Sequence, residues 1–228
     1  MRSYDEYCAI AKSLDVIGDR WTLLIVRELA ERGACRYTDL RQGLPGIASN
    51  LLAERLRDLE QAGVIVREDA PPPIATALFR LTPRGEQLRP VLDDLTRWGL
   101  PLMTEQKPGD AVRSQWLASA IELLLADRQP DGPPITLELQ TGDQPIVIEA
   151  RDGAVHTQLG PAESPDATIA GPAMPIMGLL LGLLDLRSAN TNGIAYHGDP
   201  TILDRIGGEA NLIAPSRSHT TSRPASAT

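Results

Sequence analysis

Apolar residues recur every three or four positions through most of the first hundred residues, which is the pattern of amphipathic helices. The pattern predicts four helices, over residues 7–18, 20–33, 37–42 and 47–63. Only a turn at Pro45 and Gly46 separates the third helix from the fourth. A short helix, a turn that contains glycine and a second helix in succession are typical of a helix-turn-helix.

The fourth predicted helix has an apolar face and a polar face. At about 100° per residue, the apolar face carries Leu52, Leu56 and Leu59. The opposite face carries polar or small residues, namely Ser49 at its edge, Asn50, Ala53, Glu54 and Arg57. Asn and Arg match adenine and guanine edges in the major groove, and Arg55, nearer the rim, suits a phosphate. An ordinary amphipathic helix with a solvated polar face has the same pattern.

Two alternating, β-branched segments follow at 64–68 and 77–81, and they are predicted to be strands. With the loop between them, DAPPPIAT, they form a wing directly after the helix-turn-helix. The loop is acidic and apolar, so its attraction to phosphate is weak. Arg67 and Arg80 on the strands, with Arg84 after them, are therefore the candidate phosphate contacts of the wing.

A further helix is predicted after the wing, with Thr82 as its N-cap and Pro83 at its first position. Its apolar residues are Leu88, Val91, Leu92, Leu95 and Trp98. A long apolar helix at the end of a small winged module needs a partner. We therefore expect a homodimer that reads two half-sites about one helical turn apart.

The second half of the chain predicts both helices and strands. Helices are expected over residues 111–127, 172–184 and 200–206. Strands are expected over residues 135–140, 145–150, 154–159, 166–171 and 193–199. The turn dipeptides at 142–143 and 152–153 join the first three strands into a meander. The whole chain is therefore predicted to be of the α+β class.

Composition and charge divide the chain into two modules. Among its 228 residues 42 % are apolar and 23 % charged, as in a globular protein, and the net charge of −8 excludes coating of nucleic acid by bulk charge. Residues 1–103 carry 14 Lys or Arg and 15 Asp or Glu, whereas residues 104–228 carry 8 and 15. We expect a domain at 1–103, a linker at 104–110, a domain at 111–214 and a disordered tail at 215–228.

Several classes of protein find no support in the sequence. The most apolar segment, 169–184, is shorter than the roughly 20 residues that span a bilayer, and the first ten residues do not form a signal peptide. Two cysteines make no disulfide framework, so we expect a cytoplasmic protein. No catalytic or metal motif is found, and His156 and His197 lack partners at metal-ligand spacing. We therefore expect no enzyme activity, cofactor or metal.

Residues 8–103 resemble the HxlR family of winged helix-turn-helix transcriptional regulators. The matching segments are LDVIGDRWTLLIVREL (14–29), YTDLRQGLPGI (37–47), LLAERLRDLEQAGVIVRE (51–68) and FRLTPRGEQLRPVLDDLTRWG (79–99). The resemblance implies a homodimer, a recognition helix near 48–62, and dimer contacts from the first helix and from residues 88–103. Ala48 departs from the family, which commonly has a capping Ser there, so the cap is expected to be shifted or weakened.

Residues 110–210 resemble the sterol-carrier-protein-like fold, an α/β sandwich. The matching segments are PDATIAGPAMPIMGLLLGLLDL (165–186) and GIAYHGDPTILDRI (193–206). Such domains enclose an apolar tunnel for lipids or other hydrophobic molecules. The residues that we expect to bind a ligand are apolar and partly flexible: Trp116, Met174, Met177, Leu180, Leu181 and Leu184. The alternative is that these residues only fill a core.

Cys8 stands where some members of the HxlR family carry a cysteine that senses electrophiles or oxidants. Asp5 and Glu6 nearby are expected to raise the pKa of its thiol and so to lower its reactivity. The alternative is a small buried thiol that packs the first helix. Cys35 lies outside the family pattern.

These features predict a dimeric repressor that binds a double-stranded DNA operator and releases it when its C-terminal domain binds an apolar small molecule. Three alternatives stay open. They are a redox switch at Cys8, a C-terminal domain that serves only dimerisation or protein docking, and an enzyme that acts on a hydrophobic substrate.

Overall fold

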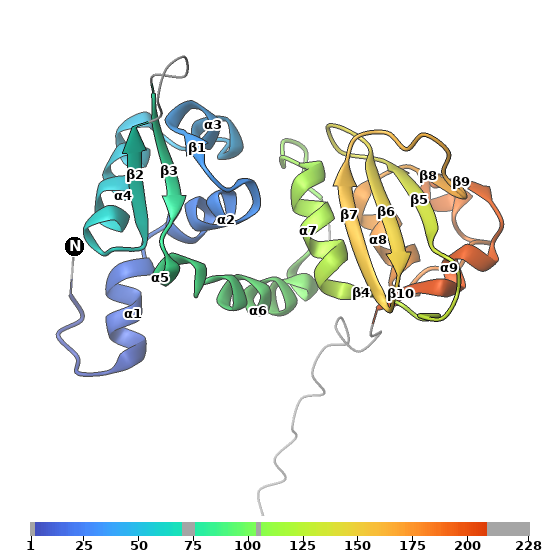
Figure 1. The fold of residues 1–228 in the computed structure, drawn as a ribbon, viewed down its shortest axis with the longest axis horizontal. Helices are drawn as coiled ribbons and strands as arrows, with labels where there is room; N and C mark the ends of the chain where they lie inside the picture. The colour runs from blue at the N-terminus through green and yellow to red at the C-terminus, as the bar shows by residue number, and fades with distance from the viewer. Residues whose placement is uncertain (1–2, 70–75, 104–105, 209–228) are drawn as a thin grey trace, which may run out of the picture. The chain divides into compact units, whose positions relative to one another are not determined.

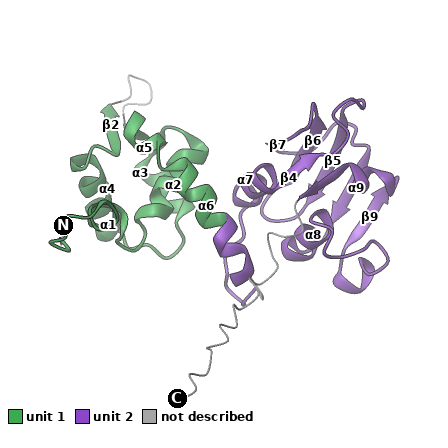
Figure 2. Ribbon diagram, turned by 90° about the horizontal axis from the view of Figure 1, so that it is seen from below, with its two compact units in different colours: residues 1–96 green, residues 97–228 purple. Residues whose placement is uncertain are grey.

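The computed structural model describes residues 3–69, 76–103 and 106–208. The chain divides into two compact units, residues 1–96 and residues 97–228 (Figure 2). The division falls within helix α6 (Arg89–Gly99), ahead of the boundary expected after residue 103. Most of the expected wing loop and the whole of the expected tail lie outside the described residues.

The first unit is a winged helix-turn-helix, as predicted (Figure 1). Its elements in chain order are α1 (Ala9–Ile17), α2 (Thr22–Arg32), β1 (Cys35–Arg36), α3 (Tyr37–Gly43), α4 (Ser49–Gln61), β2 (Ile65–Asp69), β3 (Ala77–Leu81), α5 (Pro83–Glu86) and α6. Helices α3 and α4 form the helix-turn-helix, and strands β2 and β3 pair antiparallel as the wing. Local periodicity located α1 to α4 and the strands β2 and β3 to within a few residues.

Two features of this unit differ from expectation. Residues 35 and 36 were expected to lie in a loop, but they pair antiparallel with β3 and give a sheet of order β1-β3-β2. The helix expected from residue 83 is instead two helices, α5 and α6. Pro90 has no N–H to donate and is placed in the first turn of α6, where none is needed. The predicted cap is confirmed, because Gly85 N donates to Thr82 Oγ1 over 3.1 Å.

The core of the first unit is aliphatic and is centred between α2, α4 and the small sheet. Its fully or almost fully buried members include Ile25, Val26, Leu29, Leu40, Leu44, Leu52, Leu56, Leu59, Val64 and Ile65. The three leucines of α4 are all buried, which confirms the predicted apolar face of that helix. The side of α4 opposite these leucines is therefore left to solvent.

The second unit contains a five-stranded sheet with helices. Its elements in chain order are α7 (Ser114–Leu124), β4 (Leu125–Asp127), β5 (Ile135–Gln140), β6 (Ile146–Arg151), β7 (Ala154–Leu159), β8 (Ala167–Ala170), α8 (Ala173–Leu180), β9 (Ala195–Gly198), α9 (Thr201–Arg205) and β10 (Ile206–Gly208). Short 3-10 turns occur at Leu100–Leu102 and Asn190–Asn192. The helix expected over 111–127 is shorter, because its last three residues form β4 and pair with β10.

The large sheet has the strand order β7-β6-β5-β8-β9, in which β5 and β8 run parallel and the other pairs antiparallel. The predicted meander of β5, β6 and β7 is confirmed. Alternate strand residues such as Leu137, Ile148 and Ile169 are fully buried in one core with residues of α7 and α8. Among the described residues, no helix is both long and apolar enough to cross a membrane.

Candidate nucleic-acid interface

Helix α4 presents a polar face to solvent. Ser49, Asn50, Glu54 and Arg57 are exposed, and Ala53 between them is half-buried. Arg57 Nε donates to the carbonyl of Ala53 over 3.2 Å, which lays the guanidinium along the helix surface. Arg57 forms no ion pair with any residue that the structure describes. The side chains predicted to read bases therefore share one accessible surface.

The start of α4 is held by the preceding helix and not by a side-chain cap. Ala48 is the N-cap residue, and its methyl group offers no acceptor to the first free N–H groups, so the cap is weakened and not shifted to Ser49. The hydroxyl of Tyr37 donates to the carbonyl oxygen of Ser49 over 2.7 Å. Tyr37 thus ties the beginning of α3 to the first residue of α4.

Arg55 lies differently from Arg57, although both are on α4. Its side chain is only 14 % exposed, and its guanidinium is paired with three carboxylates. Nη1 is 2.7 Å from Asp19 Oδ2 and 2.6 Å from Asp58 Oδ2, and Nη2 is 3.2 Å from Glu54 Oε1. This engagement leaves no free positive charge at Arg55, which speaks against the phosphate contact expected from the helix pattern.

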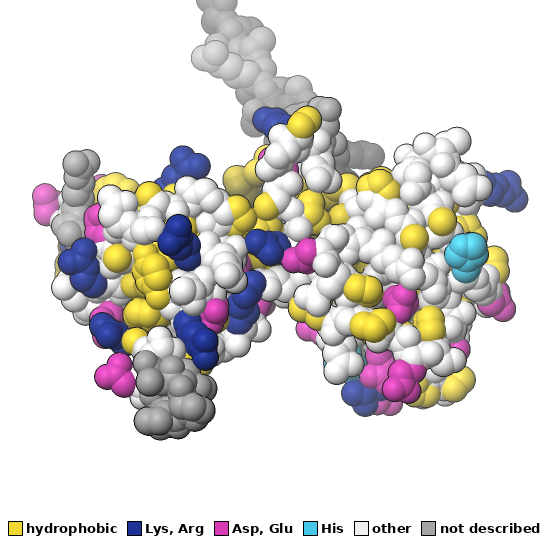
Figure 3. Space-filling view, turned by 90° about the horizontal axis from the view of Figure 1, so that it is seen from above, with side chains coloured by type: hydrophobic (Ala, Val, Ile, Leu, Met, Phe, Trp, Pro, Cys, Tyr) yellow, Lys and Arg dark blue, Asp and Glu magenta, His cyan; other side chains and the backbone are white. Residues whose placement is uncertain are grey.

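The two strand arginines of the wing are also unlike each other. Arg67 on β2 is exposed and has no ion pair among the described residues. Arg80 on β3 pairs with Glu68, and this guanidinium lowers the pKa of the Glu68 carboxyl. Figure 3 shows further Lys and Arg side chains spread over the face of the first unit that is turned to the viewer. On the two described strands of the wing, Arg67 is therefore unpaired and Arg80 is already neutralised.

Comparison with known proteins identifies the family. The family model described as HxlR-like helix-turn-helix matches residues 16–107. The HTH-type transcriptional regulator YvaP of Bacillus subtilis (strain 168) is 33 % identical over 87 residues, which are 38 % of this chain and 80 % of that protein. The chain belongs to the HxlR-like helix-turn-helix family.

Two further comparisons cover the same half of this HxlR-like chain. The HTH-type transcriptional regulator YodB of Bacillus subtilis (strain 168) is 30 % identical over 100 residues, 44 % of this chain and 86 % of that protein. The solved structure titled the reduced form of YodB is 27 % identical, covers 45 % of this chain and 100 % of that one, and has a TM-score of 0.39. By its family and by the relatives it matches, the HxlR-like chain is a transcriptional regulator with a helix-turn-helix DNA-binding domain.

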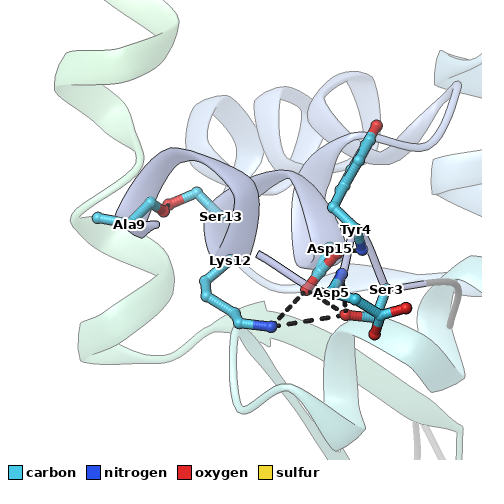
Figure 4. A network of polar contacts seen from close by, with 7 residues as sticks. All are labelled: Ser3, Tyr4, Asp5, Ala9, Lys12, Ser13 and Asp15. Atoms are coloured by element: carbon cyan, nitrogen blue, oxygen red, sulfur yellow. Dashed lines mark hydrogen bonds and ion pairs between the residues drawn. The ribbon is translucent and has the colours of Figure 1, made fainter. Parts of the chain in front are cut away.

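The N-terminal segment of this HxlR-like protein is folded back along α1 (Figure 4). Tyr4 N donates to Asp15 Oδ1 over 2.9 Å, Ser3 Oγ donates to Asp15 Oδ2 over 3.2 Å, and Lys12 Nζ is 3.4 Å from Asp15 Oδ2. These contacts, led by the Tyr4 N–H, lower the pKa of Asp15. They fix the path of the chain that leads to Cys8.

Cys8 is the N-cap residue of α1 and is exposed. The nearby backbone N–H groups of Ala11 and Ile10, at the start of α1, lower the pKa of its thiol, although the side chain makes no cap hydrogen bond. The expectation of a raised pKa at Cys8 is therefore wrong, because the free N–H groups of the helix end favour the thiolate. Cys35 is buried in β1, and burial raises the pKa of its thiol to about 11.

Apolar side chains are exposed at both ends of the HxlR-like region. On the N-terminal segment and α1 they are Tyr4, Tyr7, Ile10 and Leu14. On α6 and the turn after it they are Val91, Leu95, Trp98, Leu102 and Met103. Helix α6 has no buried residue, so its apolar stripe is without a covering element among the described residues. On α1 itself, Ile10 and Leu14 are exposed, whereas Val16 and Ile17 are half-buried and Ala11 is buried.

The six residues expected to bind a ligand lie in or next to the core of the second unit. Met177, Leu180 and Leu181 are buried among the strand residues, while Trp116, Met174 and Leu184 are half-buried. A shallow depression of about 490 Å³ lies elsewhere, lined by Gln106, Val112, Thr141, Gly142, Asp143, Gly171, Pro172 and Ala173. None of the six lines it. His156 and His197 are exposed, and no metal-binding cluster occurs among the described residues.

Helical periodicity gave no signal for two residues that contact α4 from other elements, Asp19 and Tyr37. Such contacts join different elements, and a pattern within one helix does not reveal them. The only hint in the sequence is Gly18 followed by Asp19 at the junction of the two predicted helices.

Proposed function

We propose that this regulator is a homodimer that reads a pseudo-palindromic operator with α4 in the major groove of each half-site. The observation that carries the proposal is the division of α4 into a buried leucine face and an exposed face with Asn50 and Arg57. Arg57 suits the O6 and N7 acceptors of guanine, and Asn50 suits adenine. Because Arg57 is not paired with a carboxylate among the residues that the structure describes, its guanidinium can reach a base edge without first breaking an ion pair.

Phosphate contacts position such a helix without reading sequence. Arg67 is the wing residue best suited to this role, since it is exposed and has no ion pair in the described part of the domain. Arg80 contacts a phosphate only if it first gives up its ion pair with Glu68, so its contribution to DNA affinity is smaller than that of Arg67. Ser49 lies at the helix start beside Ala53 and Glu54, where it is close enough to the groove to limit which bases fit.

The dimer is proposed from the exposed apolar residues of α1 and α6. A monomer that leaves Ile10 71 % exposed and Trp98 71 % exposed keeps large apolar surfaces in water. Burial of such side chains stabilises association by about 25 cal/mol per Å² of apolar surface. A two-fold pair that covers these residues presents two copies of α4 to adjacent half-sites.

Operator selection from a random duplex pool tests the DNA-binding proposal. Arg57→Ala is expected to weaken binding to the selected operator by about 1–3 kcal/mol and to relax the preference at one position of each half-site. Arg187→Ala removes an exposed arginine of the second unit and serves as the matched control, with unchanged affinity expected. If Arg57→Ala binds the selected operator as tightly as the wild type, the base-reading assignment is wrong.

We further propose that the second unit has the sterol-carrier-protein-like fold and senses an apolar small molecule that relieves repression. The order of its elements supports this: α7, the β5–β7 meander, β8, the apolar α8, β9 and α9 follow the sequence expected from the resemblance. Because Met177, Leu180 and Leu181 are packed, a ligand enters only by displacing them, and flexible Met177 adapts most readily. Binding then shifts the population of DNA-competent dimers.

A panel of apolar metabolites tests this part of the proposal. A sensed ligand is expected to raise the thermal unfolding midpoint and to change operator affinity in the same concentration range. A ligand that changes neither leaves the second unit as a dimerisation or docking platform, and the sensing proposal fails.

Redox control through Cys8 is a second candidate, favoured by its exposure and its lowered thiol pKa. Thiol oxidants are then expected to release the operator from the wild type but not from Cys8→Ser. Cys35→Ser is the matched control and keeps the wild-type response, because the buried Cys35 thiol stays protonated. Equal release from Cys8→Ser and the wild type excludes the switch.

A further inference from the structure

The guanidinium of Arg55 faces the protein and not the surface that α4 offers to DNA. It bridges the helix to Asp19, which lies in the loop between α1 and α2, and to Asp58 one turn further along α4. With Glu54 included, the cluster holds three carboxylates and one guanidinium, a net charge of −2. A cluster of that charge repels a phosphate, whereas it suits an arginine that joins two parts of the domain.

The loop that carries Asp19 contacts the helix-turn-helix at a second point. Trp21, the N-cap of α2, has a left-handed backbone with φ of 80°, which is uncommon for a bulky residue. Its indole ring lies beside Gly46, in the turn that leads into α4, where an added Cβ would be 3.9 Å from the ring. The α1–α2 loop thus touches α4 in its middle, through Asp19, and the turn just before its start, through Trp21.

We propose that Arg55 and Asp19 are positioning residues, which hold α4 against the α1–α2 loop and so set the angle at which its exposed side chains enter the groove. The proposal rests on the proposed reading of DNA by α4. Tyr37 fixes the first residue of α4 to α3, and the Asp19–Arg55 pair fixes the middle of the helix. Two separate attachments are the minimum that prevents rotation of the helix about one of them.

The direction in which Asp19→Asn changes operator affinity distinguishes a positioning role of Asp19 from simple charge repulsion between Asp19 and DNA. Asp19 is 57 % exposed, and removal of a carboxylate from a DNA-binding protein normally raises its affinity for DNA. A positioning Asp19 predicts the opposite, a loss of about threefold to tenfold for the operator, which is the lower part of the range of coupling between residues in contact. Glu60→Gln, at an exposed position on α4 outside the cluster, is the matched control and keeps or raises affinity.

Arg55→Lys and Arg55→Gln separate positioning from phosphate contact. Lysine keeps the charge but loses the planar fork that bridges Asp19 and Asp58, so a positioning Arg55 predicts a similar loss for both variants. The slope of log affinity against log salt concentration stays at the wild-type value, whereas each lost phosphate contact reduces it by about 0.9. Arg67→Ala supplies that reduced slope as the positive control.

The ratio of affinities for the selected operator and a scrambled duplex excludes a merely structural effect. Partial unfolding lowers binding to both duplexes equally, while a misplaced α4 loses only the operator-specific part, so the ratio is expected to fall in Asp19→Asn and Arg55→Lys. The double variant Asp19→Asn/Arg55→Lys is expected to lose no more than the larger single loss.

Two results overturn the inference while leaving the proposed function intact. One is higher operator affinity in Asp19→Asn, and the other is a salt slope reduced in Arg55→Gln as much as in Arg67→Ala. A wild-type protein that binds no duplex at low salt overturns the proposed function and this inference together.

Discussion

Asp127 and Arg205 form a two-point ion pair in the interior of the second unit, with Nε 2.8 Å from Oδ1 and Nη2 3.1 Å from Oδ2. The carboxylate is fully buried and the guanidinium side chain is 5 % exposed. Arg205 also donates to the carbonyl oxygens of Gly132 and Pro133. Residues 78 positions apart in the chain thus hold β4, the end of α9 and the 132–133 turn together.

The ion pair predicts a loss of stability in acid. The hydrogen bond from Arg205 lowers the pKa of Asp127 to about 2, from an unperturbed value of 3.8. Because the pKa of Asp127 is lower in the folded than in the unfolded protein, its ionised carboxylate stabilises the folded state fully at pH values above the unfolded pKa. This contribution to the free energy of unfolding disappears as the pH falls from about 5 to 2. At 1.36 kcal/mol per pKa unit, the loss is about 2 kcal/mol. Urea unfolding at a series of pH values measures it.

Asp127→Asn is the variant for this measurement. It leaves a buried cation without its partner, so the free energy of unfolding at pH 7 is expected to fall by about 3–5 kcal/mol. Its remaining dependence on pH below 5 is expected to be shallower than that of the wild type. Glu163→Gln, at an exposed position on the same unit, is the control. An acid transition in Asp127→Asn as steep as in the wild type contradicts the assignment.

Ala48→Ser is expected to stabilise the first unit. Ala48 has an extended backbone and already occupies the N-cap position of α4, so a serine hydroxyl there can accept a free N–H without strain. The expected gain is about 1 kcal/mol, which raises the thermal midpoint of a unit of this size by roughly 4–8 °C. Ala53→Ser places the same side chain inside the helix and is expected to lower the midpoint slightly. Equal shifts for both variants would argue against a capping effect.

Gly43→Ala is expected to destabilise the first unit through Glu28. The buried Glu28 carboxylate, which pairs with Arg27 at 2.9 Å and with Arg32 at 3.2 Å, occupies the space that a Cβ at residue 43 needs. The expected cost is about 1–3 kcal/mol in the free energy of unfolding. Gly99→Ala meets open space and serves as the control. A loss equal to that of Gly99→Ala would show that the carboxylate moves aside freely.

Removal of the apolar stripe of α6 tests the proposed dimer. Leu95→Glu combined with Trp98→Glu is expected to give a monomer in sedimentation velocity, because charges replace the side chains whose burial drives association. Leu159→Glu changes an exposed leucine of similar accessibility on β7 and is expected to keep the oligomeric state. A wild-type protein that sediments as a monomer at micromolar concentration would contradict the proposal directly.

Most secondary structure was predictable because its signals are local. The leucines of α4 and the turn dipeptides of the meander lie within a few residues of the elements that they specify. Strands β1, β4 and β10 were missed because each has two or three residues and exists only through pairing with a distant segment. No local pattern distinguishes such a strand from a loop.

The sequence located the polar face of α4, but it could not show that Arg55 is paired with carboxylates while Arg57 is not. A helical projection places Arg55 and Arg57 by angle alone, and it does not contain the loop that brings Asp19 to within 2.7 Å of Arg55. The pKa of Cys8 was misjudged for the same reason. Its neighbours in sequence are acidic, whereas its neighbours in space are the N–H groups of Ala11 and Ile10.

The amino-acid sequence alone determined the helix-turn-helix, the wing, the meander and the family, since these follow from periodicity, turn chemistry and recognisable segments. Only the tertiary structure decided which charged side chains are exposed and which form ion pairs within the protein. A charge interacts according to distance and desolvation, and both are set by residues that the fold brings in from elsewhere in the chain. This is why Arg57 is exposed without an ion pair among the described residues, while Arg55 and Arg205 are paired with carboxylates of the protein itself.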